Sequence, residues 1–234
     1  MQICRYRGHN NKRPGAHRAR KICLAWALTL WCLTLLPGCE VAPKGPPREA
    51  AVAQVLDGDT VLLVGIDKRV RLLGIDAPEM EKDGRPAQFL AHQARAGLEK
   101  LTQGQKLRLE YDQLRYDHYD RLLAYLFLPN GALVNAEMVR QGLAHVYSIP
   151  PNTRFRDALL AAQREALEAR RGIWQKALKQ DEPYYLANRN SLILHRPKCP
   201  LAGKMAPANR MRLDSLKAAY LQGFSPCRSC KPGG

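Results

Sequence analysis

Three short strings in the middle of the chain combine carboxylates with arginines, a combination that suits phosphate chemistry. They occupy residues 57–60, 71–79 and 117–125. Carboxylates and backbone carbonyls at turns are the ligands that a hard cation such as Ca²⁺ prefers. Hydrolysis of a phosphodiester places extra negative charge on its oxygens, which a cation and two arginines can stabilise. Each string alone also has a structural interpretation, because Asp-Gly usually forms a turn and an Asp–Arg pair is often a surface ion pair.

A second set of candidate ligands lies near the C-terminus. His195 and Cys199 form one closely spaced pair, and Cys227 and Cys230 form another. Two such pairs of soft donors can close a tetrahedral zinc site around a core that is too small to fold alone. A disulfide between Cys227 and Cys230 is the alternative in an oxidising compartment. We favour zinc, because the disulfide would leave His195 and Cys199 without a role.

The composition is that of a globular, strongly basic protein. The chain has 234 residues, of which 46% are hydrophobic and 25% are charged. These proportions exclude a disordered, collagen-like or disulfide-dense chain and predict one core with an appendage. The 37 lysines and arginines exceed the 21 acidic residues, which gives a formal net charge of +16. Such an excess favours a polyanionic partner, either nucleic acid or anionic lipid.

The N-terminal segment, residues 1–39, has the order of features found in a secretory signal. Basic residues precede an apolar run at 22–36, which is shorter than the ~20 residues that a spanning helix needs. The segment ends in Leu-Pro-Gly-Cys and resembles a bacterial lipoprotein signal, which implies cleavage before Cys39 and a lipid on its sulfur. A proline-rich linker at 40–51 would follow. We expect a lipid-anchored protein of the bacterial cell envelope, facing the periplasm or the exterior; a short uncleaved anchor and a non-lipidated signal are the alternatives.

The central domain, residues 52–174, carries the strand and helix patterns that must position the three strings. Short runs rich in β-branched residues, bounded by turn residues, predict strands, and apolar residues at helical spacing predict helices. The predicted barrel strands are 52–56, 60–64, 68–75, 105–111 and 122–128, with a short hairpin arm at 132–134, and the predicted helices are 86–102, 135–142 and 153–171. This pattern indicates a mainly β, α+β domain: a partly open, five-stranded OB-fold barrel with three helices, a shape that often binds oligonucleotides.

Residues 184–234 predict a second, small unit behind a polar linker at 175–183. Its pattern predicts hairpin arms at 184–187 and 191–195 and a helix at 215–222. Nine basic residues against one acid suit a DNA-tethering role, although solubility or membrane adhesion would also explain the charge. We expect Cys227→Ser to unfold this tail and to spare the activity of the central domain.

Together, and in this order, the three strings resemble the staphylococcal nuclease (thermonuclease) family. The likeness spans residues 51–174, and its most specific parts are the sequence RLLGIDAPE and, further along, the pattern DxYxRxLAY. The resemblance implies an OB-fold barrel with three helices. It also implies a Ca²⁺-dependent phosphodiesterase that cuts DNA and RNA at the 5′ P–O bond.

The resemblance also implies a metal site and a water-activating group. Asp59 and Asp76 correspond to carboxylate ligands of Ca²⁺, joined by the backbone carbonyl of Ala77. Glu79 corresponds to the residue that orients or deprotonates the attacking water. Ala77 replaces a threonine of the staphylococcal enzyme, and the metal site should survive this change because the ligand is a carbonyl oxygen. Two carboxylates make a weak site, in the ~10⁻⁴–10⁻³ M range of extracellular modules, which agrees with export.

The phosphate-binding residues follow from the same resemblance. Arg71 and Arg121 correspond to a phosphate clamp, and Tyr119 to a tyrosine that touches a neighbouring phosphate. Asp120 stands where glycine is typical, and its carboxylate could weaken the field of Arg121 or fix its rotamer. Tyr147 either stacks on a base or belongs to the core.

The tail resembles a second family. The sequences HRPKC at 195–199 and GFSPC at 223–227, with Asn209-Arg210 between them, are similar to the metal-binding domain of the Ada repair protein. This likeness implies a small zinc-binding module of the kind that is attached to nucleases and other DNA-handling domains.

The combined prediction is an exported, lipid-anchored, calcium-dependent nuclease that hydrolyses DNA, RNA or both. One alternative is a non-catalytic nucleic-acid-binding surface lipoprotein of the same fold. A structural lipoprotein whose barrel serves protein contacts is another, and it predicts no effect of calcium. The full set of carboxylates and arginines in the three strings counts against both alternatives.

Overall fold

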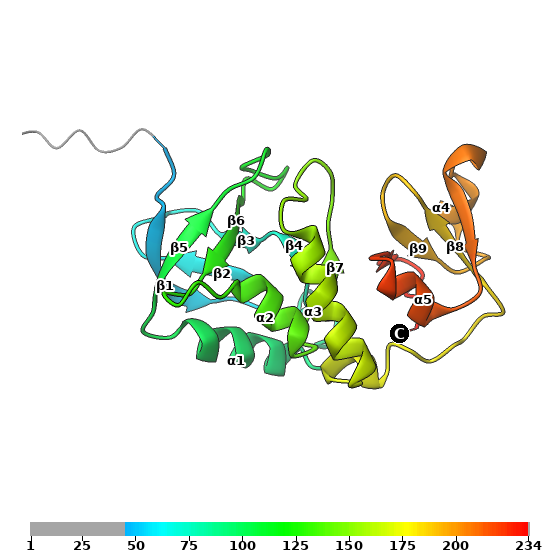
Figure 1. The fold of residues 1–234 in the computed structure, drawn as a ribbon, viewed down its shortest axis with the longest axis horizontal. Helices are drawn as coiled ribbons and strands as arrows, with labels where there is room; N and C mark the ends of the chain where they lie inside the picture. Colours follow the sequence, from blue (N-terminus) through cyan, green and yellow to red (C-terminus); the bar gives the residue numbers. More distant parts are fainter. Residues whose placement is uncertain (1–44, 234) are drawn as a thin grey trace, which may run out of the picture. The chain divides into compact units, whose positions relative to one another are not determined.

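The computed structural model describes residues 45–233 (Figure 1). The predicted signal segment, Cys39 and residues 40–44 of the proline-rich linker lie outside the described residues, and residues 49–51 of that linker belong to the first strand of the barrel. Within residues 45–233 no helix is long and apolar enough to cross a membrane.

The central domain is a closed barrel of five strands with three helices, as predicted. The strands are β1 (Glu49–Val55), β2 (Thr60–Leu63), β3 (Val70–Leu72), β5 (Lys106–Glu110) and β6 (Leu122–Phe127), in the order β1-β2-β3-β6-β5. The barrel is closed rather than partly open, because β1 pairs with both β2 and β5 while β3 pairs in parallel with β6. Alternating side chains fill the interior; on β5, for example, Leu107 and Leu109 are buried, whereas Lys106 and Arg108 are exposed.

The predicted strand at 68–75 is divided into two, and this division positions the middle string. Gly74 adopts φ +77°, and a Cβ there would collide with the Leu159 side chain. The chain therefore leaves the barrel after β3 and forms β4 (Gly74–Asp76), which pairs antiparallel with β7 (His145–Tyr147). The sequence pattern did not predict β7, because a three-residue strand is too short to show alternation.

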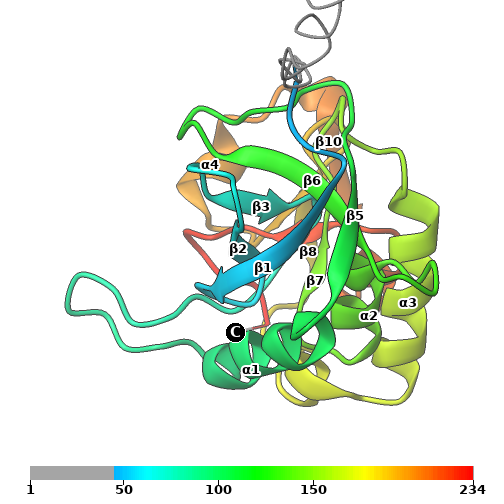
Figure 2. The same ribbon diagram turned by 90° about the vertical axis from the view of Figure 1, so that its left-hand side faces the viewer.

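The three helices begin later than or close to the predicted positions. Helix α1 (Ala91–Thr102) begins five residues after the predicted start, because Leu90 is left-handed (φ 68°) and cannot continue a helix backwards. Helix α2 (Val134–Arg140) begins at the last residue of the predicted hairpin arm 132–134. Among the described residues, the only strand-like pairing of that arm is a single bridge between Leu133 and Phe127. Helix α3 (Arg156–Glu168) lies between the barrel and the C-terminal residues (Figure 1). Figure 2 shows α1 at one end of the barrel.

The C-terminal residues form a four-stranded sheet with short helices. Its elements are β8 (Tyr185–Asn188), β9 (Ile193–His195), α4 (Pro200–Gly203), η2 (Pro207–Asn209), β10 (Arg210–Leu213), α5 (Leu216–Leu221) and β11 (Ser225–Pro226), and the strand order is β10-β8-β9-β11. The hairpin β8–β9 and the helix α5 were predicted. The strands β10 and β11 were not.

The C-terminal sheet shares a core with α3 and the η1 turn (Gly172–Gln175). Ala166, Leu167 and Trp174 pack in one buried cluster with Tyr185 and Tyr220. The rings of Trp174 and Tyr220 meet edge to face, with centroids 5.0 Å apart. Residues on both sides of the predicted linker therefore contribute to the same apolar core.

Candidate active site and metal cluster

The barrel brings three of the predicted site residues into direct contact. Asp59 immediately precedes β2, and Arg71 lies on β3 as the pairing partner of Thr60. Asp76 ends β4, and its Oδ1 accepts a hydrogen bond of 2.8 Å from Arg71 Nη2. Arg71 Nη1 forms an ion pair with Asp59. All three residues are at least 92% buried, with relative exposures of 6%, 8% and 8%, so the site is a charged cluster enclosed by the barrel wall.

The first string is held against the second by backbone contacts. Asp57 Oδ1 accepts a hydrogen bond of 2.9 Å from the Asp59 amide, which shapes the turn. Asp59 Oδ2 accepts one of 2.7 Å from the amide of Ala77. A Cβ at Gly58 would lie 2.6 Å from the Ala77 Cβ and 2.7 Å from that of Ala94. Gly58 thus permits a close approach of the turn to β4 and α1, which the Asp-Gly turn signal alone does not reveal.

Burial and neighbouring charges shift the pKa values of this cluster. Burial raises the pKa of Asp59 to about 7, although Arg71 lowers it, and the carboxylates of Asp57 and Asp76 raise it again. The pKa of Arg71 is raised, because the attraction of Asp59 and Asp76 exceeds the opposing effect of its burial. Arg71 is therefore a buried positive charge that both carboxylates share.

His145 is a member of the site that sequence reasoning missed. It is the pairing partner of Asp76, and its Nε2 lies 4.0 Å from Asp76 Oδ2. This nitrogen is buried and has no hydrogen-bond partner among residues 45–233. Burial lowers the pKa of His145, so a neutral ring faces the carboxylate. Only the pairing of β4 with β7 would have revealed this neighbour.

Glu79 and Ala77 follow β4 at the rim of the cluster. The Glu79 side chain is exposed, whereas its backbone is fixed by Gln88: the Glu79 amide donates to Gln88 Oε1 (3.2 Å), and the Gln88 amide donates to the Glu79 carbonyl (2.9 Å). Among the described residues, the Glu79 carboxylate forms no hydrogen bond or ion pair. It is therefore accessible to water and to a ligand.

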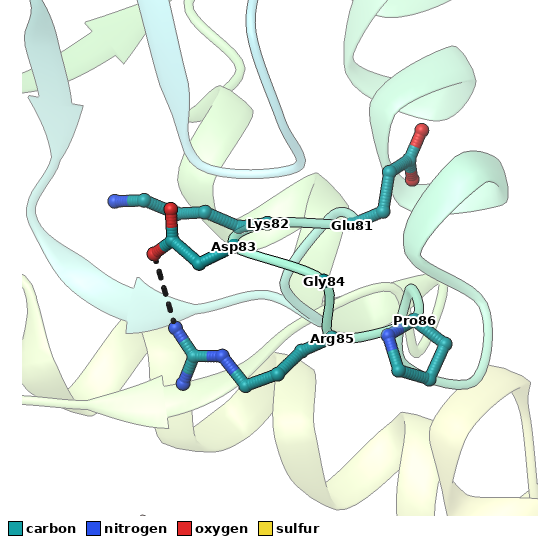
Figure 3. A pocket seen from close by; sticks show the side chains of 6 residues that line it. All are labelled: Glu81, Lys82, Asp83, Gly84, Arg85 and Pro86. Carbon is teal, nitrogen blue, oxygen red and sulfur yellow. Dashed lines mark ion pairs between the residues drawn. The ribbon is translucent and has the colours of Figure 1, made fainter.

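The loop that follows carries a separate, shallow hollow. Residues 81–86 line it, and Figure 3 shows the side chains of Asp83 and Arg85 paired, 3.6 Å apart. The backbones of Lys82 and Arg85 also pair, which closes the turn. None of the carboxylates or arginines of the cluster lines this hollow, so we assign no ligand to it.

Arg121 and Tyr119 form no contact with the carboxylates of the cluster among the described residues; Arg121 directly precedes β6, the strand that pairs with the Arg71 strand β3. Arg121 Nε donates to Asp117 Oδ2 (2.8 Å), and its guanidinium lies 5.5 Å from the centre of the Tyr119 ring. Burial would raise the pKa of Asp117, but hydrogen bonds from Arg121 lower it below its usual value. Asp120, in contrast, pairs with Lys68. The carboxylate that holds Arg121 is therefore Asp117, which sequence reasoning did not single out.

The C-terminal residues contribute an unexpected arginine to the cluster. Arg228 Nη2 donates to Asp76 Oδ1 at 2.5 Å, across 152 positions of sequence. The same oxygen accepts from Arg71. No local signal could have revealed this contact, because it depends on how the C-terminal sheet packs on β7.

The four predicted soft ligands converge. The ligand atoms of His195, Cys199, Cys227 and Cys230 all lie within 4.8 Å of one another. His195 ends β9, Cys199 directly precedes α4, and the other two cysteines follow β11. The three cysteines are free thiols, so the alternative disulfide is not formed. The Arg196 amide donates to Cys230 Sγ (3.3 Å), so this sulfur has a hydrogen bond from outside the set of four, as metal ligands commonly have. One imidazole and three thiols are a donor set that suits Zn²⁺.

Comparison with known proteins gives two family matches. A sequence model described as staphylococcal nuclease homologue matches residues 69–176. A second, described as the metal binding domain of Ada, matches residues 168–233. The two matches cover nearly all of the described chain after β2.

Individual relatives agree with the first match. A thermonuclease of Staphylococcus intermedius is 38% identical over 127 residues, which are 53% of this chain and 75% of the relative. A thermonuclease of Staphylococcus hyicus is 33% identical over 125 residues, covering 53% and 73%. The endonuclease YncB of Bacillus subtilis is 34% identical over 128 residues, covering 53% and 60%.

Proposed function

From the premise that this chain belongs to the staphylococcal nuclease family, and is a nuclease, we propose that it hydrolyses DNA, RNA or both in a calcium-dependent reaction at the Asp59–Arg71–Asp76 cluster. The observation that carries this proposal is the enclosure of two carboxylates and an arginine in one buried cluster. Burial of charged groups costs free energy unless a partner charge or a bound ion compensates for it.

The donor set fits a hard cation. Asp59 and Asp76 would supply carboxylate oxygens, and Ala77, whose amide donates to Asp59 Oδ2, would supply its backbone carbonyl. The buried Nε2 of His145, 4.0 Å from Asp76 Oδ2 and without a hydrogen-bond partner among the described residues, leaves a polar atom beside this carboxylate that a ligand of the site could satisfy. Oxygen ligands of this kind suit Ca²⁺. When bound, Ca²⁺ would neutralise the carboxylates and draw electron density from the phosphate.

The remaining residues have roles that follow from their accessibility. Arg71 forms ion pairs with both carboxylates. If a cation neutralised Asp59 and Asp76, the N–H groups of Arg71 would be available to a phosphate. Arg121, oriented by Asp117, is the second clamp residue, and Tyr119, which is 70% exposed, can touch a neighbouring phosphate. The exposed carboxylate of Glu79 is the group that orients or deprotonates water.

The test is an incubation of the full chain with plasmid DNA and with RNA, first with calcium and then with a chelator. Calcium-dependent cutting supports the proposal. Gel retardation without cutting would support a non-catalytic nucleic-acid-binding protein instead. No effect of calcium on cutting or binding would contradict the assigned metal site.

We propose that the C-terminal cluster holds zinc as a structural ion. Its four donors match a tetrahedral site, and the matched Ada domain is a metal-binding one. Metal analysis of the purified chain tests this proposal, with one zinc per chain as the expected result. A stoichiometry near zero after purification without chelator would contradict it.

The proposed location is the bacterial cell envelope, with a lipid on Cys39. Support comes from the order of basic, apolar and small residues before this cysteine. Mass spectrometry of the N-terminal peptide and membrane fractionation test it, with Cys39→Ser as the comparison. An unmodified Cys39, or equal membrane association of the variant, would contradict the lipid anchor.

A further inference from the structure

Arg228 reaches the active-site cluster from the segment that also carries two of the four metal ligands. We call residues 227–230 the knuckle, since Cys227 and Cys230 enclose Arg228 between them. Arg228 Nη2 donates to Asp76 Oδ1 at 2.5 Å, and its guanidinium lies 5.4 Å from the centre of the Tyr147 ring. The contact therefore joins the C-terminal module directly to a proposed metal ligand.

Arg228 retains donors that the protein does not use. Asp76 Oδ1 already accepts from Arg71, so two guanidinium groups share one carboxylate oxygen. A guanidinium has five N–H donors, and the side chain of Arg228 is 61% exposed, whereas that of Arg71 is only 10% exposed. An anion that enters the site from solvent would thus meet Arg228 before Arg71.

The position of the knuckle is fixed by the same strand that fixes Asp76. Ser225 Oγ, directly before the knuckle, donates to the Val146 carbonyl of β7 at 2.6 Å. Val146 is the pairing partner of Ile75 on β4, next to Asp76. Gln163 of α3 accepts from the Val146 amide (2.7 Å) and donates to the Tyr220 carbonyl (2.6 Å). Arg228 and Asp76 are therefore carried by elements that are hydrogen-bonded to one another.

A groove adjoins Arg228. It has a volume of about 470 Å³ and is lined by Tyr147 of β7 and by residues of the C-terminal module, which include Lys204, Arg228 and the candidate metal ligands His195 and Cys227. Basic side chains next to an aromatic ring suit the backbone and bases of a single nucleic-acid strand.

We infer that Arg228 is a substrate-binding residue, which the metal-bound knuckle presents to a phosphate of the nucleic-acid strand, and that the adjoining groove continues the path of that strand. This inference rests on the proposed nuclease function. It assigns a role in substrate binding to the C-terminal module, through one side chain of defined position.

Binding and cutting by Arg228→Ala test the inference, with Lys217→Ala as the control. Lys217 is an exposed residue of α5 that lies outside the groove lining, and its replacement removes the same charge. In a Glu79→Gln background with calcium, fluorescence anisotropy measures the Kd of a short single-stranded oligonucleotide. We expect Arg228→Ala to raise this Kd about tenfold or more, since a charged hydrogen bond is lost. Lys217→Ala should stay within about twofold.

Steady-state cutting by the same substitutions with Glu79 intact provides a second measurement. Arg228→Ala should raise KM about tenfold, and Arg228→Lys should recover part of the loss, because lysine keeps the charge but not the fork of donors. Equal effects of Arg228→Ala and Lys217→Ala would overturn the inference in favour of overall charge. Tighter binding or faster cutting by Arg228→Ala would also overturn it, since the contact with Asp76 would then be inhibitory.

Zinc removal tests the part played by the knuckle. A zinc-selective chelator should raise the oligonucleotide Kd of the parent protein about as much as Arg228→Ala does, and should change the Kd of Arg228→Ala little further. An equal further loss in both proteins would overturn the role of the knuckle in presenting Arg228. If the parent protein fails to cut with calcium, the proposed function fails, but the comparison of Kd values still decides the role of Arg228.

Discussion

Arg71 is the side chain on which both buried carboxylates of the site depend. It contacts Asp59 and Asp76 at once, and all three side chains are at most 12% exposed. Removing one partner of a buried charge pair leaves the others unpaired, which is more damaging than never having formed the pair. The same residue is also a proposed phosphate ligand, so stability and catalysis should respond to it together.

We predict that Arg71→Ala lowers kcat at least ~100-fold, as expected when one transition-state donor is lost. In calcium-free buffer it should also lower the free energy of unfolding by about 3–5 kcal/mol, because Asp59 then loses its ion pair inside the barrel and Asp76 keeps only its contact with Arg228. Calcium should restore part of that stability. Urea unfolding with and without calcium measures this difference, and equal destabilisation in both buffers would contradict a cation site between the carboxylates.

Asp117 and Asp120, two carboxylates close to Arg121 in the sequence, should differ in their effect on kcat. Asp120 pairs with Lys68 at an exposed position and has φ 59°, so glycine would relieve backbone strain there. The Asp117 carboxylate accepts hydrogen bonds from the backbone amide and from the Nε of Arg121, and it thereby orients this arginine. We predict that Asp120→Gly keeps kcat within about twofold and changes stability by less than about 1 kcal/mol. Asp117→Ala should lower kcat about tenfold or more. A larger loss of kcat in Asp120→Gly would show that this carboxylate acts on Arg121 after all.

The residues of the site differ in how far the sequence alone could predict them. Asp59, Arg71 and Asp76 lie in local strings whose strand starts and turns are visible in the pattern, and the barrel brings them together as expected. His145 and Arg228 carry no local signal. Their places depend on the pairing of β4 with β7 and on the packing of the C-terminal sheet, which are long-range contacts between very short elements.

At the scale of elements, the site depends on a close approach of three segments. The turn at Gly58, the residue after β4 and the helix α1 meet where a Cβ on Gly58 would lie 2.6 Å from Ala77 and 2.7 Å from Ala94. Both distances are too short for carbon atoms, so a side chain there would push these segments apart.

We therefore predict that Gly58→Ala lowers the free energy of unfolding by about 1–3 kcal/mol, the usual effect of overpacking. It should also weaken calcium binding, because Asp59 moves away from Ala77 and Asp76. Gly203→Ala is the matched control, since nothing lies within 4 Å of a Cβ at that position. Denaturant unfolding and calcium titration measure the two effects. Equal behaviour of the two variants would contradict the tight contact.

The predictability of the elements depends on their own sequence pattern. Strands and helices of five residues or more were predicted with shifted boundaries, because their apolar spacing is readable, and the shorter β2, β8 and β9 were predicted because turn residues flank them. The division of the strand at 68–75 depends on one left-handed glycine, Gly74, which the alternation pattern does not reveal. The strands β7, β10 and β11 were missed because pairing partners, more than their own composition, define them.

At the scale of the whole molecule, the nuclease barrel and the C-terminal sheet share structure rather than only a linker. Helix α3 gives Leu159 and Ala162 to the barrel core and Ala166 and Leu167 to the core that contains Tyr220. Segments with a common core tend to unfold together. This packing gives a reason to replace the sequence-based expectation that the tail would unfold without effect on the barrel.

We predict that loss of zinc destabilises the whole described unit in a single transition. Cys227→Ser should lower the unfolding temperature by about 10 °C, as a loss of ~3–5 kcal/mol would in a domain of this size, and should lower nuclease activity because Arg228 is no longer held near Asp76. Lys217→Ala, an exposed change in α5 outside the groove lining, is the control. Calorimetry with and without a zinc-selective chelator measures the transitions. Two separate transitions, the upper one independent of zinc, would show that the shared core does not couple the two parts, since α3 would then remain folded on the barrel after the C-terminal sheet had unfolded.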